Sequence, residues 1–247
     1  GLLRKITHLD INELKFIQLG INKAYATYKG NTNNELGVLT FKYDLDGLPI
    51  YTDYYNNFNN HIITEIKDFD VYQDSMLYIT TDVGIFHGNN NKNLKIAENW
   101  SLLYSNSDVE QFIPGDNHII LLRNHAIYQY DDEWHTYCDL AYSDNLISSI
   151  QYNGSTYILT EENLYKITNC DIISFRIPIG NQNEYSNSLG FDYKTIFTSF
   201  DIDKNEEIYI GVKYNGIIKL QDMVNYEHYI PSTSIVNEFR AITILES

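Results

Sequence analysis

The sequence predicts an all-β chain that folds as a β-propeller of four-stranded antiparallel sheets, or blades. Three observations predict it: a composition rich in strand-forming residues, short alternating strands separated by turns, and a repeat of these strands along the chain. The 247 residues include 33 Ile and 22 Tyr but only 6 Ala. β-Branched and aromatic residues fit a half-buried pleated surface, whereas alanine favours helices.

The segment 66–100 shows the repeating unit. Apolar and polar residues alternate over 66–72, 76–80 and 85–87, with turn residues between them, and we expect a fourth strand over 94–100. Four short strands joined by tight turns make one antiparallel sheet.

Equivalent segments recur along the chain. Landmark residues in the five third strands are Val38, Ile85, Ile127, Leu164 and Ile217. The steps between them are 47, 42, 37 and 53 residues, which bracket the ~40 to 50 residues of a propeller blade. A β-sandwich would lack this longer period. We therefore expect five complete blades, at about 11–56, 62–104, 108–140, 146–180 and 194–231.

The two ends of the chain also carry strand patterns. Residues 1–7 resemble a third strand and residues 235–247 a first strand, so we expect a sixth blade split between the termini. Such closure removes exposed sheet edges. The alternative is that the chain forms part of a larger propeller. In either case the sequence predicts a single propeller domain over 1–247.

We interpret the large strand residues as core residues before considering any functional role for them. Large side chains on alternating positions are expected to fill the core between blades, namely Ile79, Phe86, Ile120, Tyr128, Ile158, Tyr209 and Ile217. Cys138 and Cys170 match no metal-binding spacing, and we expect two semi-buried free thiols.

The charge of the chain excludes two classes of partner. With 17 Lys+Arg and 33 Asp+Glu, the formal net charge is −16. A nucleic-acid reader or a polybasic membrane binder needs a basic surface. No apolar run approaches the roughly 18 to 20 residues of a membrane span, so we expect neither nucleic-acid binding nor direct membrane insertion.

The repeats resemble a known family of propeller blades. Residues 76–86 (MLYITTDVGIF) are similar to the core of the two-component-regulator propeller repeat, with a strand ending in hydroxyl residues, a polar turn and a Gly-aliphatic pair. Residues 156–165 and 207–217 look similar. The resemblance extends to PorZ-like propellers linked to type IX secretion and, alternatively, to tail-nozzle propellers of short-tailed phages. It implies an extracytoplasmic location, at the cell surface or in the periplasm, or a virion.

Catalytic and metal-binding motifs give little support to an enzyme. The chain has no G-x-S-x-G elbow, and its seven histidines are scattered. The segment 201–206 begins like a calcium loop but lacks the glycine at the sharp turn, so we interpret it as a hairpin turn. The sequence therefore predicts no enzyme, no metal and no cofactor.

A recognition surface is predicted instead. In a propeller, the loops between second and third strands and those between blades emerge on one face, and loop aromatics on a rigid scaffold commonly bind partners. The candidate binding residues are His61, Asp82, Asp108, His125, Tyr142, Asp144, Glu161, Tyr185, Tyr193 and Tyr214. Their charge favours a basic or neutral partner.

The hypothesis that follows is a non-enzymatic interaction or assembly domain that binds a protein partner in a larger bacterial surface, secretion or phage-tail complex. Two alternatives stay open at this point: a carbohydrate-active hydrolase or lyase, and an extracytoplasmic sensor of a small ligand or carbohydrate.

Overall fold

The computed structural model describes residues 10–20, 22–31, 35–115, 119–122, 126–131, 133–140, 145–176, 197–213 and 216–229. The predicted split blade, 1–7 with 235–247, lies outside these residues. The described chain consists of twenty strands and one 3₁₀ segment, η1 (Ala97–Asn99), so the all-β prediction is confirmed. The chain divides into two compact units, 1–140 and 141–247.

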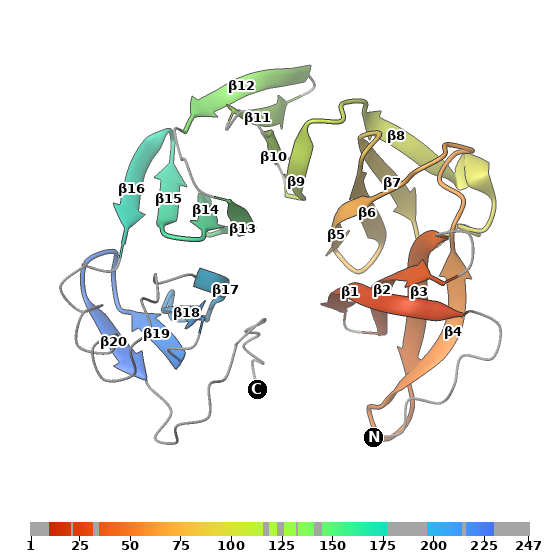
Figure 1. Ribbon diagram of the computed structural model, residues 1–247, viewed down its shortest axis with the longest axis horizontal. Helices are drawn as coiled ribbons and strands as arrows, with labels where there is room; N and C mark the ends of the chain where they lie inside the picture. Colours follow the sequence, from red (N-terminus) through yellow and green to blue (C-terminus); the bar gives the residue numbers. More distant parts are fainter. Residues whose placement is uncertain are drawn as a thin grey trace. The chain divides into compact units, whose positions relative to one another are not determined.

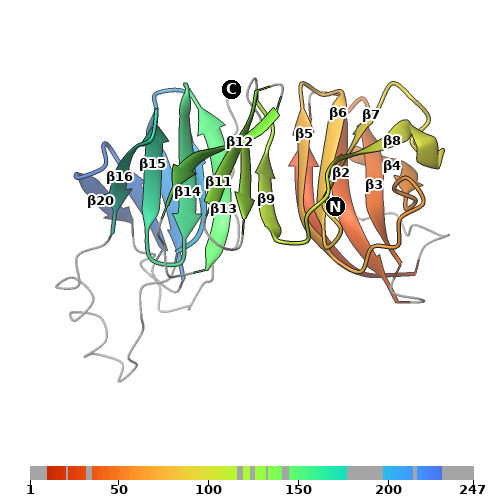
Figure 2. The same cartoon turned by 90° about the horizontal axis from the view of Figure 1, so that it is seen from above.

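Unit 1 contains three four-stranded sheets, which we call blades one to three (Figure 1). Blade one is β1 (Ile11–Leu19), β2 (Lys23–Gly30), β3 (Leu36–Tyr43) and β4 (Pro49–Tyr55). Blade two is β5 (Ile66–Tyr72), β6 (Met76–Thr81), β7 (Ile85–Asn89) and β8 (Trp100–Tyr104). Blade three is β9 (Val109–Ile113), β10 (Ile119–Leu122), β11 (Ala126–Asp131) and β12 (Glu133–Asp139). Each sheet is an antiparallel meander in sequence order, so its connecting loops gather at two opposite ends (Figure 2).

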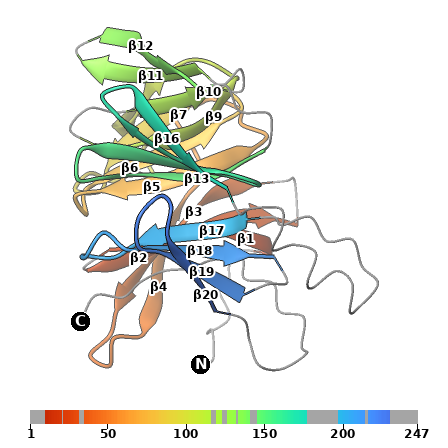
Figure 3. The ribbon, with the colours of Figure 1, turned by 90° about the vertical axis from the view of Figure 1, so that its left-hand side faces the viewer.

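Unit 2 contains two sheets of the same kind, blades four and five. Blade four is β13 (Leu146–Tyr152), β14 (Ser155–Thr160), β15 (Leu164–Thr168) and β16 (Asp171–Phe175). Blade five is β17 (Phe197–Ile202), β18 (Ile208–Val212), β19 (Gly216–Leu220) and β20 (Tyr226–Tyr229), which lie side by side in that order (Figure 3). The five predicted four-stranded meanders are therefore present.

One predicted strand is wrong. The fourth strand of blade two begins at Trp100 instead of covering 94–100, because 94–99 form turns and η1. The Trp100 indole N–H donates to the Leu94 carbonyl at 2.9 Å, and both side chains are buried. The Trp100 ring also packs edge-on against Phe58, with centroids 4.9 Å apart. Because this large ring is buried, the preceding segment packs against it as turns and a 3₁₀ segment. Apolar periodicity in the sequence does not predict such packing.

Steric crowding explains why a glycine precedes the aliphatic residue of the third strand in the repeat. Gly84 precedes the third strand of blade two with φ +145°, and a Cβ there would collide with the carbonyl oxygen of Tyr104 at the end of β8. Gly37 has the same place in blade one, where a Cβ would collide with the carbonyl oxygen of Tyr55 at the end of β4. The Gly-aliphatic pair therefore marks where the fourth strand crosses close to the start of the third.

The hydroxyl residue of the repeat closes the turn before the third strand. The Thr81 hydroxyl donates to the carbonyl of Gly84 at 2.9 Å and accepts the N–H of Val83 at 3.1 Å. In blade four, the Thr160 hydroxyl bonds in the same way with the carbonyl and N–H of Asn163, both at 3.1 Å. Because the side chain satisfies backbone groups that a tight turn leaves unpaired, threonine recurs at this position.

Apolar side chains from adjacent blades form the cores. Within unit 1, one cluster around Phe69, Phe86 and Trp100 joins blades one and two, and a smaller one around Tyr78 and Phe112 joins blades two and three. In unit 2, blades four and five share a single cluster that includes Leu159, Leu164, Phe197, Ile210 and Ile218. Each blade thus buries apolar surface against a neighbour, which a single sheet cannot do alone.

The predicted core residues are only partly confirmed. Ile79, Phe86 and Ile158 are fully buried, whereas Tyr128, Tyr209 and Ile217 are only partly buried. For the last two, the reason is the strand period of two, because Ile210 and Ile218 occupy the core-facing positions and their neighbours point to the other face. The side chain of Ile120 lies outside the described set.

The oxidation state of the two cysteines differs from the expectation. Cys138 and Cys170 are both disulfide-bonded, so the expectation of free thiols is wrong; sequence spacing carries no information on the oxidation state of isolated cysteines. In the described part of the chain, no helix is both long and apolar enough to cross a membrane.

The first strand of every blade carries a β-bulge, and β1 carries a second one at Asn12. In β5, Ile66 pairs with Thr81 and Asp68 with Thr80, so Lys67 is the extra residue. The corresponding residues are Lys15 and Phe16 in β1, Glu110 in β9, Ile147 in β13 and Thr198 in β17. A bulge changes the direction in which a side chain leaves the strand, so these positions are set apart from the regular pleat.

Candidate functional site

The loops of unit 1 that end the second and fourth strands emerge at one end of its sheets. We call this end the loop face of unit 1. Its described residues are Asn31, Glu35, 56–65, 82–84 and 105–108. It is the end at which the sequence predicts recognition, and it contains three of the ten predicted site residues, His61, Asp82 and Asp108.

Asp82 connects two segments of the loop face by hydrogen bonds. Its carboxylate accepts the N–H of Thr64 at 3.0 Å, the hydroxyl of Thr64 at 2.6 Å and the N–H of Glu65 at 3.2 Å. Despite some desolvation, these hydrogen bonds lower the pKa of Asp82. Both carboxylate oxygens are therefore engaged in tying the β6–β7 turn to the segment that enters β5.

Glu161 occupies the same position in blade four. Its backbone N–H donates to the carbonyl of Asn145 at 3.0 Å, as that of Asp82 does to Glu65 at 3.3 Å. Its side chain accepts from the Asn145 amide at 3.1 Å. The Glu161 carbonyl then accepts the N–H of Phe197 at 2.7 Å, linking blade four to blade five. Glu161 thus ties a turn to two strand entries.

His61 and Asp108 are exposed. The His61 ring lies edge-on to Phe86, with centroids 5.2 Å apart, and its Nδ1 is 2.9 Å from the carbonyl oxygen of Asn59. Asp108 uses its backbone N–H to bond the Asn106 side chain at 2.8 Å. The six other predicted site residues, His125, Tyr142, Asp144, Tyr185, Tyr193 and Tyr214, lie outside the described residues.

A pocket of about 170 Å³ lies at the loop face of unit 1, between blade one and the entry to β5. Four charged residues line it: Glu13 and Lys15 on β1, Lys29 on β2, and Glu65. Three hydroxyl residues, Thr27, Tyr28 and Thr64, and two apolar ones, Leu36 and Ile66, complete the lining. The pocket offers charges of both signs beside hydroxyl and apolar groups.

A pair of carboxyl groups, the buried Asp68 and the partly buried Asp70, lies further along β5. Asp68 is 8% exposed, and burial raises its pKa to about 7 although it accepts the N–H of Phe112 at 3.3 Å. Burial, and then the charge of Asp68, raise the pKa of Asp70 well above its usual range. Gln18 of blade one donates to the Asp70 carboxylate at 3.3 Å. Burial thus disfavours the charged forms of both groups, and hydrogen bonds from Gln18 and from the Phe112 N–H connect the pair to blades one and three.

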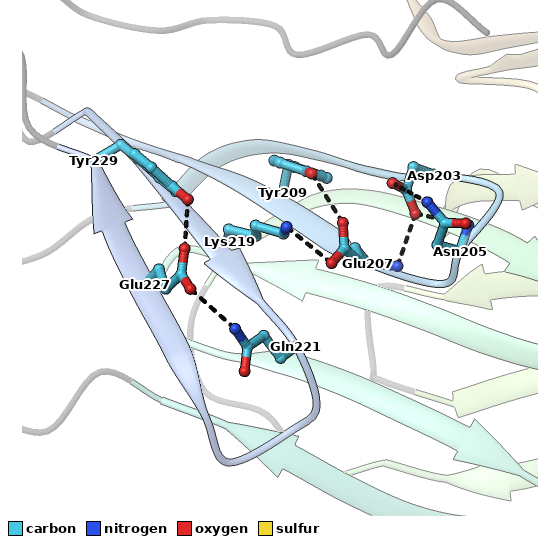
Figure 4. Close-up of polar contacts among 8 residues, drawn as sticks. All are labelled: Asp203, Asn205, Glu207, Tyr209, Lys219, Gln221, Glu227 and Tyr229. Atoms are coloured by element: carbon cyan, nitrogen blue, oxygen red, sulfur yellow. Dashed lines mark hydrogen bonds and ion pairs between the residues drawn. The ribbon is translucent and has the colours of Figure 1, made fainter.

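Blade five presents a polar face opposite its core (Figure 4). Glu207 accepts the Tyr209 hydroxyl at 3.2 Å and pairs with the Lys219 ammonium at 2.8 Å, which raises the pKa of Lys219. Glu227 accepts the Tyr229 hydroxyl and, at 3.0 Å, the Gln221 amide. These side chains satisfy one another, so this face is an internally paired network.

The hairpin expected at 201–206 is present: Asp201 and Ile202 end β17, and the turn follows at Asp203. The Asp203 carboxylate accepts the N–H groups of Asn205 and Glu207, each at 2.9 Å, which closes the β17–β18 hairpin (Figure 4). Within the described residues, no group of three His, Cys, Asp or Glu side chains could hold a metal ion.

Sequence reasoning missed the residues of the pocket and the carboxylate pair. The pair had only a weak signal, because Asp68 and Asp70 alternate with Phe69 and Val71 and so look like the solvent-facing residues of an ordinary strand. The pocket had no comparable signal, because Glu13, Lys29 and Glu65 look like ordinary solvated charges until the strands and the β5 entry are placed together.

The comparison with known proteins concerns the fold. No family model matches the chain, and no curated protein matches its sequence. Solved structures do match. The extracellular domain of the putative hybrid two component system BT4673 from B. thetaiotaomicron superimposes with a TM-score of 0.52 at 14% identity, covering 96% of this chain and 36% of that chain. The chain has a β-propeller fold.

Two other propellers are similar. PorZ, a surface component of the type-IX secretion system of Porphyromonas gingivalis, matches with a TM-score of 0.50 at 12% identity, covering 91% of this chain and 39% of that chain. The structure described as YCF48 bound to D1 peptide matches at 0.57 with 8% identity, covering 92% and 71%. This β-propeller thus spans about two fifths or less of the BT4673 and PorZ chains.

Proposed function

We propose that this β-propeller is a non-enzymatic interaction domain of a larger extracytoplasmic assembly, and that it binds a protein partner through the loop face of unit 1. The observation that carries the proposal is the combination, at this face, of a polar pocket with the exposed side chains His61, Ile62 and Asp108. A rigid scaffold that presents exposed loop residues around a concave site is typical of binding domains.

The similar structures support the same class of function. PorZ is described as an essential component of a secretion system, and YCF48 is described with a bound peptide. The oxidised state of both cysteines supports an extracytoplasmic location, since disulfides persist in oxidising compartments. The net charge of −16 favours a partner surface that is basic or neutral over one that is acidic.

Two exposed aliphatic residues give a matched test. Ile62 lies on the loop face and is 88% exposed, whereas Leu45 lies in the β3–β4 turn at the other end of unit 1 and is 106% exposed. A photo-crosslinking amino acid at position 62, introduced in the source cells, is expected to trap one discrete partner, and the same group at position 45 is expected to trap none. Mass spectrometry of the adducts then identifies the partner.

Single substitutions at positions 62 and 45 then measure how much each end of unit 1 contributes to partner binding. Ile62→Asp is expected to weaken association with the trapped partner at least tenfold, because it puts a charge into a desolvated contact, and Leu45→Asp is expected to leave it unchanged. Both variants should keep the melting temperature of the parent chain. Equal crosslinking at the two positions, or equal effects of the two substitutions, would contradict the proposed function.

A further inference from the structure

Lys67, the bulge residue of blade two, uses its side chain to connect two blades. Lys67 donates from its ammonium to the carbonyl oxygens of Ser107 at 2.6 Å and Val109 at 2.9 Å. These residues belong to the segment that enters blade three. The lysine therefore closes the junction between blades two and three from the loop face.

Lys15 has the equivalent position in blade one, but it leaves its junction open. The acceptors that correspond to those of Lys67 are the carbonyl groups of Thr64 and Ile66, which line the pocket together with Lys15. Among the described residues, Lys15 makes no hydrogen bond or ion pair. Its ammonium lies 4.7 Å from the Phe16 ring centroid, and its charge opposes the rise in the pKa of Asp68 that burial causes. The pocket is thus the junction that the repeat closes elsewhere with a lysine.

The hydroxyl groups of the pocket are already engaged. The Thr27 hydroxyl accepts the N–H of Phe16 at 3.0 Å, and the Thr64 hydroxyl donates to Asp82 at 2.6 Å. The Tyr28 hydroxyl donates to Glu35 at 2.9 Å. Each of these hydroxyl groups thus already makes one hydrogen bond within the protein, and the charged side chains are the remaining strong donors and acceptors of the lining.

The charged side chains are not paired with one another. Glu13 and Lys29 face each other across β1 and β2 in the register, yet no ion pair joins them, and none joins Lys15 or Glu65 to another described residue. Two ammonium groups and two carboxylates are therefore available to a ligand, and their charges cancel. A ligand with only one sign of charge would be repelled by half of the lining.

The size of the pocket limits what can enter. A volume of about 170 Å³ is well below the 300 to 1,000 Å³ usual for drug-sized ligands, so the pocket has room for the charged end groups of two side chains but not for a larger ligand. We propose that the pocket receives a pair of oppositely charged neighbouring residues of the partner protein, the carboxylate contacting Lys15 and Lys29 and the basic group contacting Glu13 and Glu65.

This inference rests on the proposed function and has its own test. The probes are four capped, dye-labelled hexapeptides that differ only in the central pair: Lys-Asp, Lys-Lys, Asp-Asp or Asn-Gln. Fluorescence anisotropy with the full chain at low ionic strength is expected to give at least fivefold tighter binding of the Lys-Asp peptide than of the other three. Low ionic strength matters because exposed charge pairs are weak and screened by salt.

Charge exchange in the pocket gives the sharper result. K15E/K29E makes the lining wholly acidic and is expected to shift the preference to the Lys-Lys peptide. The fourfold exchange E13K/K15E/K29E/E65K restores both signs and is expected to restore the preference for the Lys-Asp peptide. As a control, K42E/K92E changes the net charge equally at two exposed lysines away from the pocket and is expected to keep the order of the parent chain.

The two proposals fail in different ways. If the four peptides bind the parent chain equally, or if K15E/K29E and K42E/K92E give the same order of affinities, the pocket does not read charge pairs and this inference is wrong. Trapping of a partner at position 62 would then still support the loop face as the binding surface. If position 62 traps no partner while the peptide preference follows the pocket variants, the proposed function fails alone.

Discussion

Replacing Gly84 with alanine is expected to remove more than about 3 kcal/mol from the free energy of unfolding of unit 1. Two causes act together. The φ of +145° at Gly84 is almost inaccessible to alanine, and the added Cβ would collide with the carbonyl oxygen of Tyr104. Because that oxygen belongs to the backbone at the end of β8, the clash can be relieved only by moving the strand. Urea unfolding followed by circular dichroism measures the loss.

Two other glycines separate the causes. Gly47→Ala has only the conformational cost, since φ is +75° and nothing lies within 4 Å of the new Cβ, and about 1 to 2 kcal/mol is expected. Gly37→Ala has the collision with the Tyr55 carbonyl and no positive φ. We expect Gly84→Ala to exceed both single-cause variants. A loss at Gly84 no larger than that at Gly47 would show that the fourth strand is not held against the turn.

Asp68→Asn is expected to stabilise unit 1 above pH 7 and to have little effect near pH 4. Burial raises the pKa of Asp68 to about 7 in the folded chain, against an unfolded value of 3.8. The unfolded chain therefore loses this proton first, and the free energy of unfolding falls as pH rises from about 4 to about 7. A shift of about three pH units corresponds to at most about 4 kcal/mol, which the neutral asparagine does not lose.

Melting temperatures of both chains between pH 4 and pH 8 test this. Asp82→Asn is the opposite control, because hydrogen bonds lower the pKa of Asp82. Its ionised form stabilises the fold above the unfolded pKa, and that contribution is lost as pH falls. Asp82→Asn is therefore expected to destabilise at pH 7 and less at pH 3. Parallel pH profiles for the parent chain and Asp68→Asn would contradict the buried carboxylate pair.

The five four-stranded sheets could be predicted from the sequence alone, because strand alternation and turn residues are local signals. The third-strand landmarks and the hairpin at 201–206 follow directly from them. The fourth strand of blade two was misplaced because the packing of Trp100 on Phe58 decides where it begins. Long-range packing of this kind leaves no period in the sequence.

The candidate site could be predicted only as a location. Asp82 and Glu161 were found as acidic loop residues, but their roles depend on the residues they contact, Thr64 and Asn145, which precede them by 18 and 16 positions. The pocket depends on the side chain of Lys15, whose place in a bulge is a matter of strand register. Register and bulges arise from pairing between strands and cannot be read from either strand by itself.

The repeated bulge has a consequence for how such a protein can change. Its extra residue is inserted outside the regular strand pairing, so side chains of different chemistry occur there on the same backbone. Lysine, glutamate, isoleucine and threonine all occur there, at Lys67, Glu110, Ile147 and Thr198. Each blade therefore places its own side chain at this point of a shared backbone, so the contacts made there differ from blade to blade while the four-stranded sheet is kept.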